Sequence, residues 1–172
     1  KKLNKTIKLI FIVTAMNFSL AIFSAKQVQS TEQNMRFDIG YKKVDRTKTL
    51  RKFFEKYNSP LVDSSEKFVE VADKYNIDYK LLPSISCVES TCGKFYVEGT
   101  YNTFGWGGGY IPFNSFDESI EEVGAGLNEI YLSKGYDTVE EIAPIYTPPN
   151  YRNWISGVRY FSSQIDEISK VI

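Results

Sequence analysis

Five stretches of this chain place apolar side chains at spacings of three and four residues. That spacing gives an α-helix one apolar face, whereas few segments alternate as a half-buried strand would. The sequence therefore predicts a mostly α-helical domain, which we place at residues 45–172. The five stretches lie within residues 50–57, 68–75, 78–88, 120–131 and 154–172.

Local signals mark where several of these helices begin. Asn150 has the character of an N-cap for the last helix. A short turn is predicted at residues 138–143, closed by Pro144. Two pairs have the spacing of a capping box, which opens a helix: Asp63 with Glu66, and Ser115 with Glu118.

About 25 residues separate the third predicted helix from the fourth, and they carry no periodic pattern. A loop of this length inside a compact domain is usually functional. Gly124 and Gly126, in the helix that follows, predict close approach of a neighbouring element.

The N-terminal part of the chain differs from the rest. Residues 1–25 combine a basic start with an apolar run that is shorter than the roughly 20 residues of a membrane span. They are interpreted as a secretion signal, with a retained membrane anchor as the alternative. Residues 26–44 are polar and aperiodic, which is typical of a linker. Either reading of the first segment places the domain outside the cytoplasm, secreted or in the cell envelope.

Composition excludes several kinds of chemistry. The chain has no histidine and two cysteines, which removes Ser-His-Asp and Cys-His hydrolases and structural zinc sites. We expect no metal and no cofactor. Beyond residue 30 the chain has 16 basic and 21 acidic residues, a net charge of −5, which argues against nucleic-acid binding. Cys87 and Cys92 either form a disulfide, as an exported chain favours, or remain two thiols.

Glu89 is the residue on which a functional interpretation turns. It shares a helical face with Leu82, Ile85 and Ser86, and it immediately precedes the long loop. A carboxyl in a partly apolar setting has a raised pKa and can donate a proton, as cleavage of a glycosidic bond requires. The alternative is a helix-end carboxylate bonded to the following turn.

Four segments occur in an order that resembles the glucosaminidase (endo-β-N-acetylglucosaminidase-like) family of the lysozyme-like superfamily. They span roughly residues 80 to 155 and read SCVESTCG, YNTFG, FNSFDESIEEVGAGL and GYDTVEEIAPIYTPPNY. The resemblance implies a lysozyme-like helical domain with one long irregular active-site loop. Since only WGGGYIP separates the second segment from the third, the β-lobe is expected to be reduced or absent.

The resemblance also implies roles for individual residues. Glu89 would be the general acid, and Tyr146 would orient the sugar's 2-acetamido group or stabilise positive charge. Glu98 is the only acid in the loop and a candidate second carboxylate. Tyr96 adds aromatic surface suited to sugar rings. The residues expected to bind substrate are Ser90, Tyr101, Asn102, Phe104, Gly105, Trp106, Tyr110 and Tyr151.

The sequence thus leads to an exported, monomeric glycosidase that cleaves the glycan strands of peptidoglycan. A lytic transglycosylase, which yields an anhydro-sugar product, is the alternative among enzymes. A glycan-binding module without activity, or a membrane-tethered scaffold, is the alternative outside them.

Overall fold

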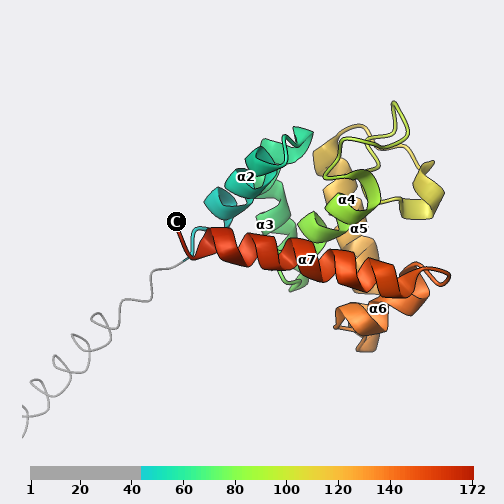
Figure 1. Cartoon of the computed structure of the whole chain (residues 1–172). Coiled ribbons are helices and arrows are strands. Elements are labelled where there is room, and N and C mark those ends of the chain that lie inside the picture. The colour runs from blue at the N-terminus through green and yellow to red at the C-terminus, as the bar shows by residue number, and fades with distance from the viewer. Residues whose placement is uncertain (1–43) are drawn as a thin grey trace, which may run out of the picture. The chain divides into compact units, whose positions relative to one another are not determined.

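The structure is a computed structural model that describes residues 44–172 (Figure 1). This part of the chain contains helices and no strand, so the prediction of a mostly α-helical domain is confirmed. None of the helices in it has the length and apolar character needed to cross a bilayer. The predictions of a signal or anchor at 1–25 and of a linker at 26–44 lie outside the described residues, except for residue 44.

The helices follow the five predicted stretches closely. Three short 3-10 turns, at Pro60–Val62, Trp106–Gly109 and Leu132–Lys134, interrupt the connections. Between α4 and α5 the chain is irregular over residues 91–115, as predicted. The α-helices are α2 (Arg46–Lys56), α3 (Ser65–Tyr75), α4 (Leu81–Ser90), α5 (Phe116–Ile130), α6 (Val139–Tyr146) and α7 (Tyr151–Ser169).

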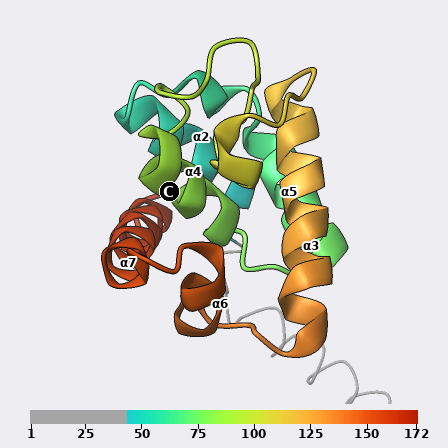
Figure 2. The ribbon, with the colours of Figure 1, turned by 90° about the vertical axis from the view of Figure 1, so that its right-hand side faces the viewer.

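Helix α4 is the centre of the domain. It packs along α7, and in Figure 2 it lies between α7 and α5. Buried side chains therefore occur on every side of it, from Leu82 to Cys87 without a break, rather than along one stripe. Pro83 falls in its first turn, where a proline needs no helical hydrogen bond. This helix carries Glu89 at its last turn.

Aromatic side chains join the other helices and the loop to this centre. Phe53 of α2 meets Phe161 of α7 with ring centroids 6.4 Å apart. Phe104, in the irregular segment, is fully buried and lies 6.4 Å from the ring of Phe68 in α3. The side chain of Phe104 thus anchors the loop in the core.

Two sequence predictions about helix ends are wrong. Helix α3 begins at Ser65 with Ser64 as its N-cap, and Asp63 pairs with Arg51 instead of forming a capping box. The predicted turn at 138–143 is the first part of α6, which continues through Pro144 to Tyr146.

Helix α6 tolerates Pro144 because its N-terminus is well capped and its inner face is buried. The Thr138 and Glu141 side chains form a reciprocal capping box. Ile142 and Ala143 are fully buried. Pro144 removes only its own N–H from the helix and lies exposed on the outer face. The extra turn brings Tyr146 to the end of α4.

The carboxylate of Glu121, in α5, links this helix to α3 through ion pairs and a hydrogen bond. Lys67 and Lys74 donate to opposite oxygens of Glu121 at 2.6 and 2.5 Å, and the Tyr75 hydroxyl donates at 2.9 Å. Hydrogen bonds from the two lysines lower the pKa of Glu121 from 4.5 to about 2. The ionised form is therefore bound more tightly in the folded protein, and its contribution to stability is present above pH ~4.5 and disappears as the pH falls towards 2.

We expect Glu121→Gln to lower the free energy of unfolding at pH 7 by about 1 kcal/mol, because a partly exposed charge network contributes modestly. The adjacent Glu122→Gln should change it by less than about 0.5 kcal/mol, since Glu122 is exposed. Urea unfolding measures both variants. The gap between Glu121→Gln and the native chain should shrink as the pH is lowered from 4.5 to 2.5, and a gap that stays constant would contradict the assignment.

Candidate functional site

Helix α4 ends in a tight turn closed by a disulfide. Thr91, Cys92 and Gly93 all have positive φ angles, of 53°, 58° and 78°, which stop the helix directly after Ser90. Cys87 and Cys92 form a disulfide, and both are buried. The Ser59 hydroxyl donates to the Cys92 carbonyl at 2.7 Å. The turn after Glu89 is therefore fixed both by the disulfide and by the hydrogen bond from Ser59.

Glu89 is open to solvent and yet closely flanked by protein. The indole N–H of Trp154 donates to its Oε1 at 2.8 Å. Its residue surface is exposed, which leaves room for a ligand, while the protein around its carboxyl removes enough water to matter electrostatically. This desolvation raises the pKa of Glu89, and the hydrogen bond from Trp154 partly opposes the rise. Glu89 is thus exposed as a residue, while its carboxyl lies in a partly desolvated setting.

Tyr146 lies in the same corner and holds the loop. Its hydroxyl donates to the Phe104 carbonyl at 2.6 Å. Burial raises the pKa of Tyr146 well above its ordinary value of 10, and the charge of Glu89 adds to the effect, so the phenol stays protonated at neutral pH. Its ring lies 5.1 Å from Trp154 and 6.0 Å from Trp106, centroid to centroid. Trp154 and Tyr146 therefore lie beside the carboxyl, and Trp106 packs against Tyr146.

Gly105 completes this corner from the loop. Its φ of 63° is left-handed, and a Cβ at this position would lie 3.0 Å from Glu89 Oε2. The backbone of the loop therefore passes directly against the carboxyl. Trp106 next to it packs on α5, where a Cβ on Gly126 would meet the indole at 2.5 Å. This confirms the predicted close approach at Gly126.

Ser90 ties the loop to the end of α4, and Asn102 ties the loop to itself. The Ser90 hydroxyl lies 2.7 Å from the Thr103 carbonyl and accepts from the Gly93 N–H at 3.0 Å. The Asn102 amide donates to the carbonyls of Trp106 and Ile111 at 2.8 and 3.1 Å, and its oxygen accepts from the Trp106 N–H at 3.0 Å.

Three residues expected to bind substrate therefore have another role. Ser90, Asn102 and Phe104 are all buried, with 3%, 2% and 0% of their surface exposed. Their side chains have no free polar group or surface to offer a ligand. We assign these three residues the role of positioning the loop. This role accounts for the motif in which they occur without any contact with substrate.

The other tyrosines expected at the site contact different neighbours. Tyr101 stacks on Tyr96 with centroids 6.4 Å apart and meets Phe116 edge-on at 5.1 Å. Tyr110 is 76% exposed. Tyr151, half-buried at the start of α7, lies against Arg152.

The structure joins none of these tyrosines to Glu89 by a hydrogen bond or ring contact, and it does not join Glu98 to it either. Glu98 is exposed. The pKa of Glu89 responds to burial and to Trp154, with no contribution from a second carboxylate. Residues 44–172 contain no group of three or more Asp, Glu, His or Cys side chains arranged to hold a metal ion.

Trp154 is the site residue that sequence reasoning missed. Its place in the apolar stripe of α7 predicts a core side chain, and Trp154 is indeed 97% buried. The available signal was chemical: a buried indole N–H needs an acceptor.

A scan against protein-family models matches no family, and a search of curated proteins finds no match to this chain.

Proposed function

We propose that residues 45–172 form an exported lysozyme-like domain that cleaves the glycan strands of peptidoglycan, at N-acetylglucosaminyl bonds. The observation that carries the proposal is the state of Glu89. The residue is exposed, and its carboxyl has a raised pKa and accepts a hydrogen bond from Trp154. Those are the properties of a general acid that protonates a leaving group.

In the proposed reaction Glu89 gives its proton to the glycosidic oxygen as the bond to the anomeric carbon breaks. The oxygen of the sugar's 2-acetamido group forms a bond to that carbon, which removes the need for a protein nucleophile. Water then displaces the acetamido oxygen from the anomeric carbon, which restores the acetamido group, and gives a proton to the Glu89 carboxylate. This route needs one protein carboxyl, in keeping with the absence of a second carboxylate effect on Glu89.

Tyr146 enters the proposal in a narrower role than the resemblance implied. Its hydroxyl proton is committed to the Phe104 carbonyl. It is therefore not available to donate to the acetamido group, although the lone pairs of its oxygen are compatible with stabilising positive charge. We assign Tyr146 chiefly to positioning the loop beside Glu89.

A lytic transglycosylase is the second candidate, and the same observation supports it. With a single carboxyl, the attacking group after bond cleavage can equally be a hydroxyl of the sugar itself. The two reactions differ in their products. Mass spectrometry of the fragments that the protein releases from purified peptidoglycan tests the proposal: reducing-end sugars indicate a hydrolase and anhydro sugars a transglycosylase. Binding to the wall without release of any fragment would overturn the enzyme proposal in favour of a glycan-binding module.

The hydrogen bond from Trp154 makes a prediction about pH. It stabilises the ionised form of Glu89, so Trp154→Phe should raise the pKa of Glu89 further. Since the proton donor is the protonated form, the fall of activity on the alkaline side should move to higher pH. Loss of the contact that positions the carboxyl should also reduce kcat by about tenfold. The pH profile of fragment release measures both effects.

Trp106→Phe is the matched control, since the Trp106 indole makes no hydrogen bond to Glu89 while its ring also adjoins Tyr146. Its pH profile should keep the native alkaline limb. A Trp154→Phe profile that stays in place, or moves to lower pH, would contradict the role given to the indole N–H.

A further inference from the structure

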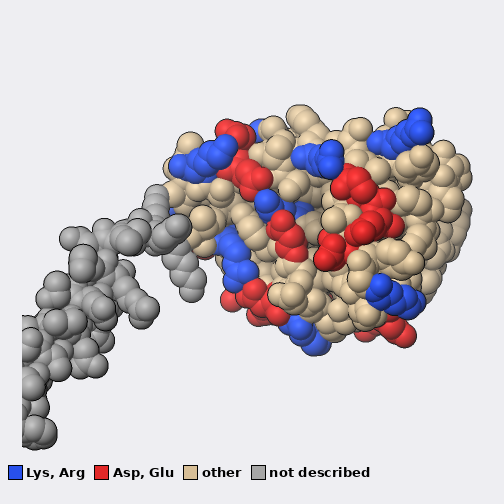
Figure 3. Space-filling view, turned by 90° about the horizontal axis from the view of Figure 1, so that it is seen from below, with Lys and Arg blue, Asp and Glu red and all other residues tan. Residues whose placement is uncertain are grey.

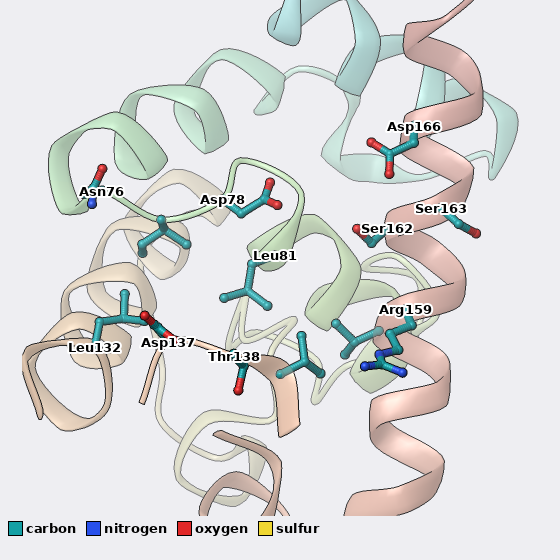
Figure 4. A pocket seen from close by; sticks show the side chains of 13 residues that line it. Asn76, Asp78, Leu81, Leu132, Asp137, Thr138, Arg159, Ser162, Ser163 and Asp166 are labelled. Atoms are coloured by element: carbon teal, nitrogen blue, oxygen red, sulfur yellow. The ribbon is translucent and has the colours of Figure 1, made fainter. Parts of the chain in front are cut away.

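A pocket of about 380 Å³ lies at the other end of α4 from Glu89. Leu81, at its floor, precedes Glu89 by eight residues, or roughly 12 Å along the helix. The pocket is bounded by the chain before α4, by the connection from the Leu132–Lys134 turn to α6, and by α7 (Figure 4). It is thus a separate feature from the corner around Glu89.

The floor of the pocket is apolar. Ile77, Leu81, Leu132, Val139 and Val158 supply it, from four different segments of the domain. Ile77 and Val158 are buried, and the other three are half-buried. A cavity of this volume with an apolar floor suits a small aliphatic group.

The rim is acidic. Asp78, Asp137 and Asp166 line the pocket, with Arg159 as the only cation of residues 44–172 that does so. Figure 4 shows the Asp166 carboxylate on the α7 side and Asp137 on the opposite side, with Leu81 between them. On the face of the domain seen in Figure 3, acidic side chains gather near the middle.

The cationic side chains near the pocket already form ion pairs. Lys80 Nζ lies 2.9 Å from Asp166 and 3.6 Å from Asp78. Arg159 pairs with Glu140 at 2.8 Å. No side chain of residues 44–172 donates to the carboxylate of Asp137, whose backbone N–H is bonded to Glu141. The rim therefore retains net negative charge and one carboxylate without a partner in the described part of the chain.

We propose that this pocket binds the side chain of lysine, or of a similar diamino acid, in a peptide. The methylene groups would lie on the apolar floor and the terminal ammonium would pair with Asp137. An anionic ligand would meet the acidic rim, and a purely apolar one would leave Asp137 unpaired. If the proposed function holds, the peptides attached to the glycan strands are a natural source of such a side chain, but binding does not depend on cleavage.

Titration of the ¹⁵N-labelled full chain tests this proposal, with Nα-acetyl-lysine N-methylamide as the probe. The backbone amides of residues 137–139 and 162–163 should shift, with a dissociation constant in the millimolar range. Nα-acetyl-norleucine N-methylamide has the same aliphatic chain without the ammonium and should bind about threefold to tenfold more weakly, as a partly exposed ion pair implies.

Variants separate the pocket from general attraction to an acidic protein. Asp137→Asn should reduce affinity for the lysine probe to that for the norleucine probe. Glu122→Gln removes an exposed charge of α5 that does not line the pocket, and it should leave the affinity unchanged. The proposal is overturned if the pocket amides do not shift, if the two probes bind equally, or if Asp137→Asn binds like the native chain. None of these results depends on whether Glu89 is catalytic.

Discussion

Replacement of Glu89 by glutamine is expected to reduce the release of peptidoglycan fragments by about 10²- to 10⁴-fold. Glutamine has the same shape and keeps an oxygen that can accept the Trp154 N–H, so the corner should stay intact. It cannot donate a proton as a carboxylic acid does. Chromatography and mass spectrometry of soluble sugars, at equal concentrations of folded protein, measure the loss.

Two further observations make this result specific. Glu98→Gln should release fragments at nearly the native rate, because Glu98 is exposed and makes no contact with Glu89 in the structure. Sedimentation with insoluble wall should show that Glu89→Gln still binds, since the substitution exchanges one carboxyl oxygen for an amide NH₂ group and leaves the rest of the site unchanged. Fragment release by Glu89→Gln at the native rate would end the assignment of Glu89 as the general acid.

Substitution of Gly105 by alanine should reduce activity about tenfold while leaving the protein folded. The added methyl group would lie 3.0 Å from Glu89 Oε2, and the carboxyl must shift by a few tenths of an ångström to accommodate it. Small displacements of a reacting group have large effects on rate. The left-handed φ of 63° adds a loss of stability of about 1–2 kcal/mol.

Gly99→Ala separates these two effects. Its φ of 81° imposes similar backbone strain, but a Cβ there has no neighbour within 4 Å. Thermal unfolding should show a comparable loss of stability in both variants, whereas fragment release should fall only in Gly105→Ala. Equal activity in the two would mean that the contact with Glu89 has no part in the reaction.

Helical periodicity was sufficient to predict the positions of five of the six α-helices in residues 44–172. The five apolar stretches became helices because each has a side that can be buried. It failed at α6, where Pro144 suggested an end and a capping box with buried Ile142 outweighed it. A proline removes one hydrogen bond, and tertiary burial can compensate for that.

The site was less accessible to sequence reasoning, and Trp154 shows why. A stripe of apolar residues identifies the side of a helix that is buried, but it does not say which member of the stripe meets a carboxyl from another helix. Glu89 stood out because it was polar at the end of an apolar run. Ser90 and Asn102 stood out as well, and their chemistry proved to serve the backbone of the loop.

The hydrogen bonds within the loop determine where its length can vary. Asn102 bridges the backbone at Trp106 and Ile111, so an insertion between these residues would separate groups that one amide must reach at once. The exposed turn at Glu98 and Gly99 is closed by two hydrogen bonds from Thr100 to the Val97 carbonyl, and a longer turn could replace them without disturbing Asn102. Related chains should therefore keep a fixed number of residues from 102 to 111 and differ in length before residue 100, where an extended arm could grow without moving the carboxyl.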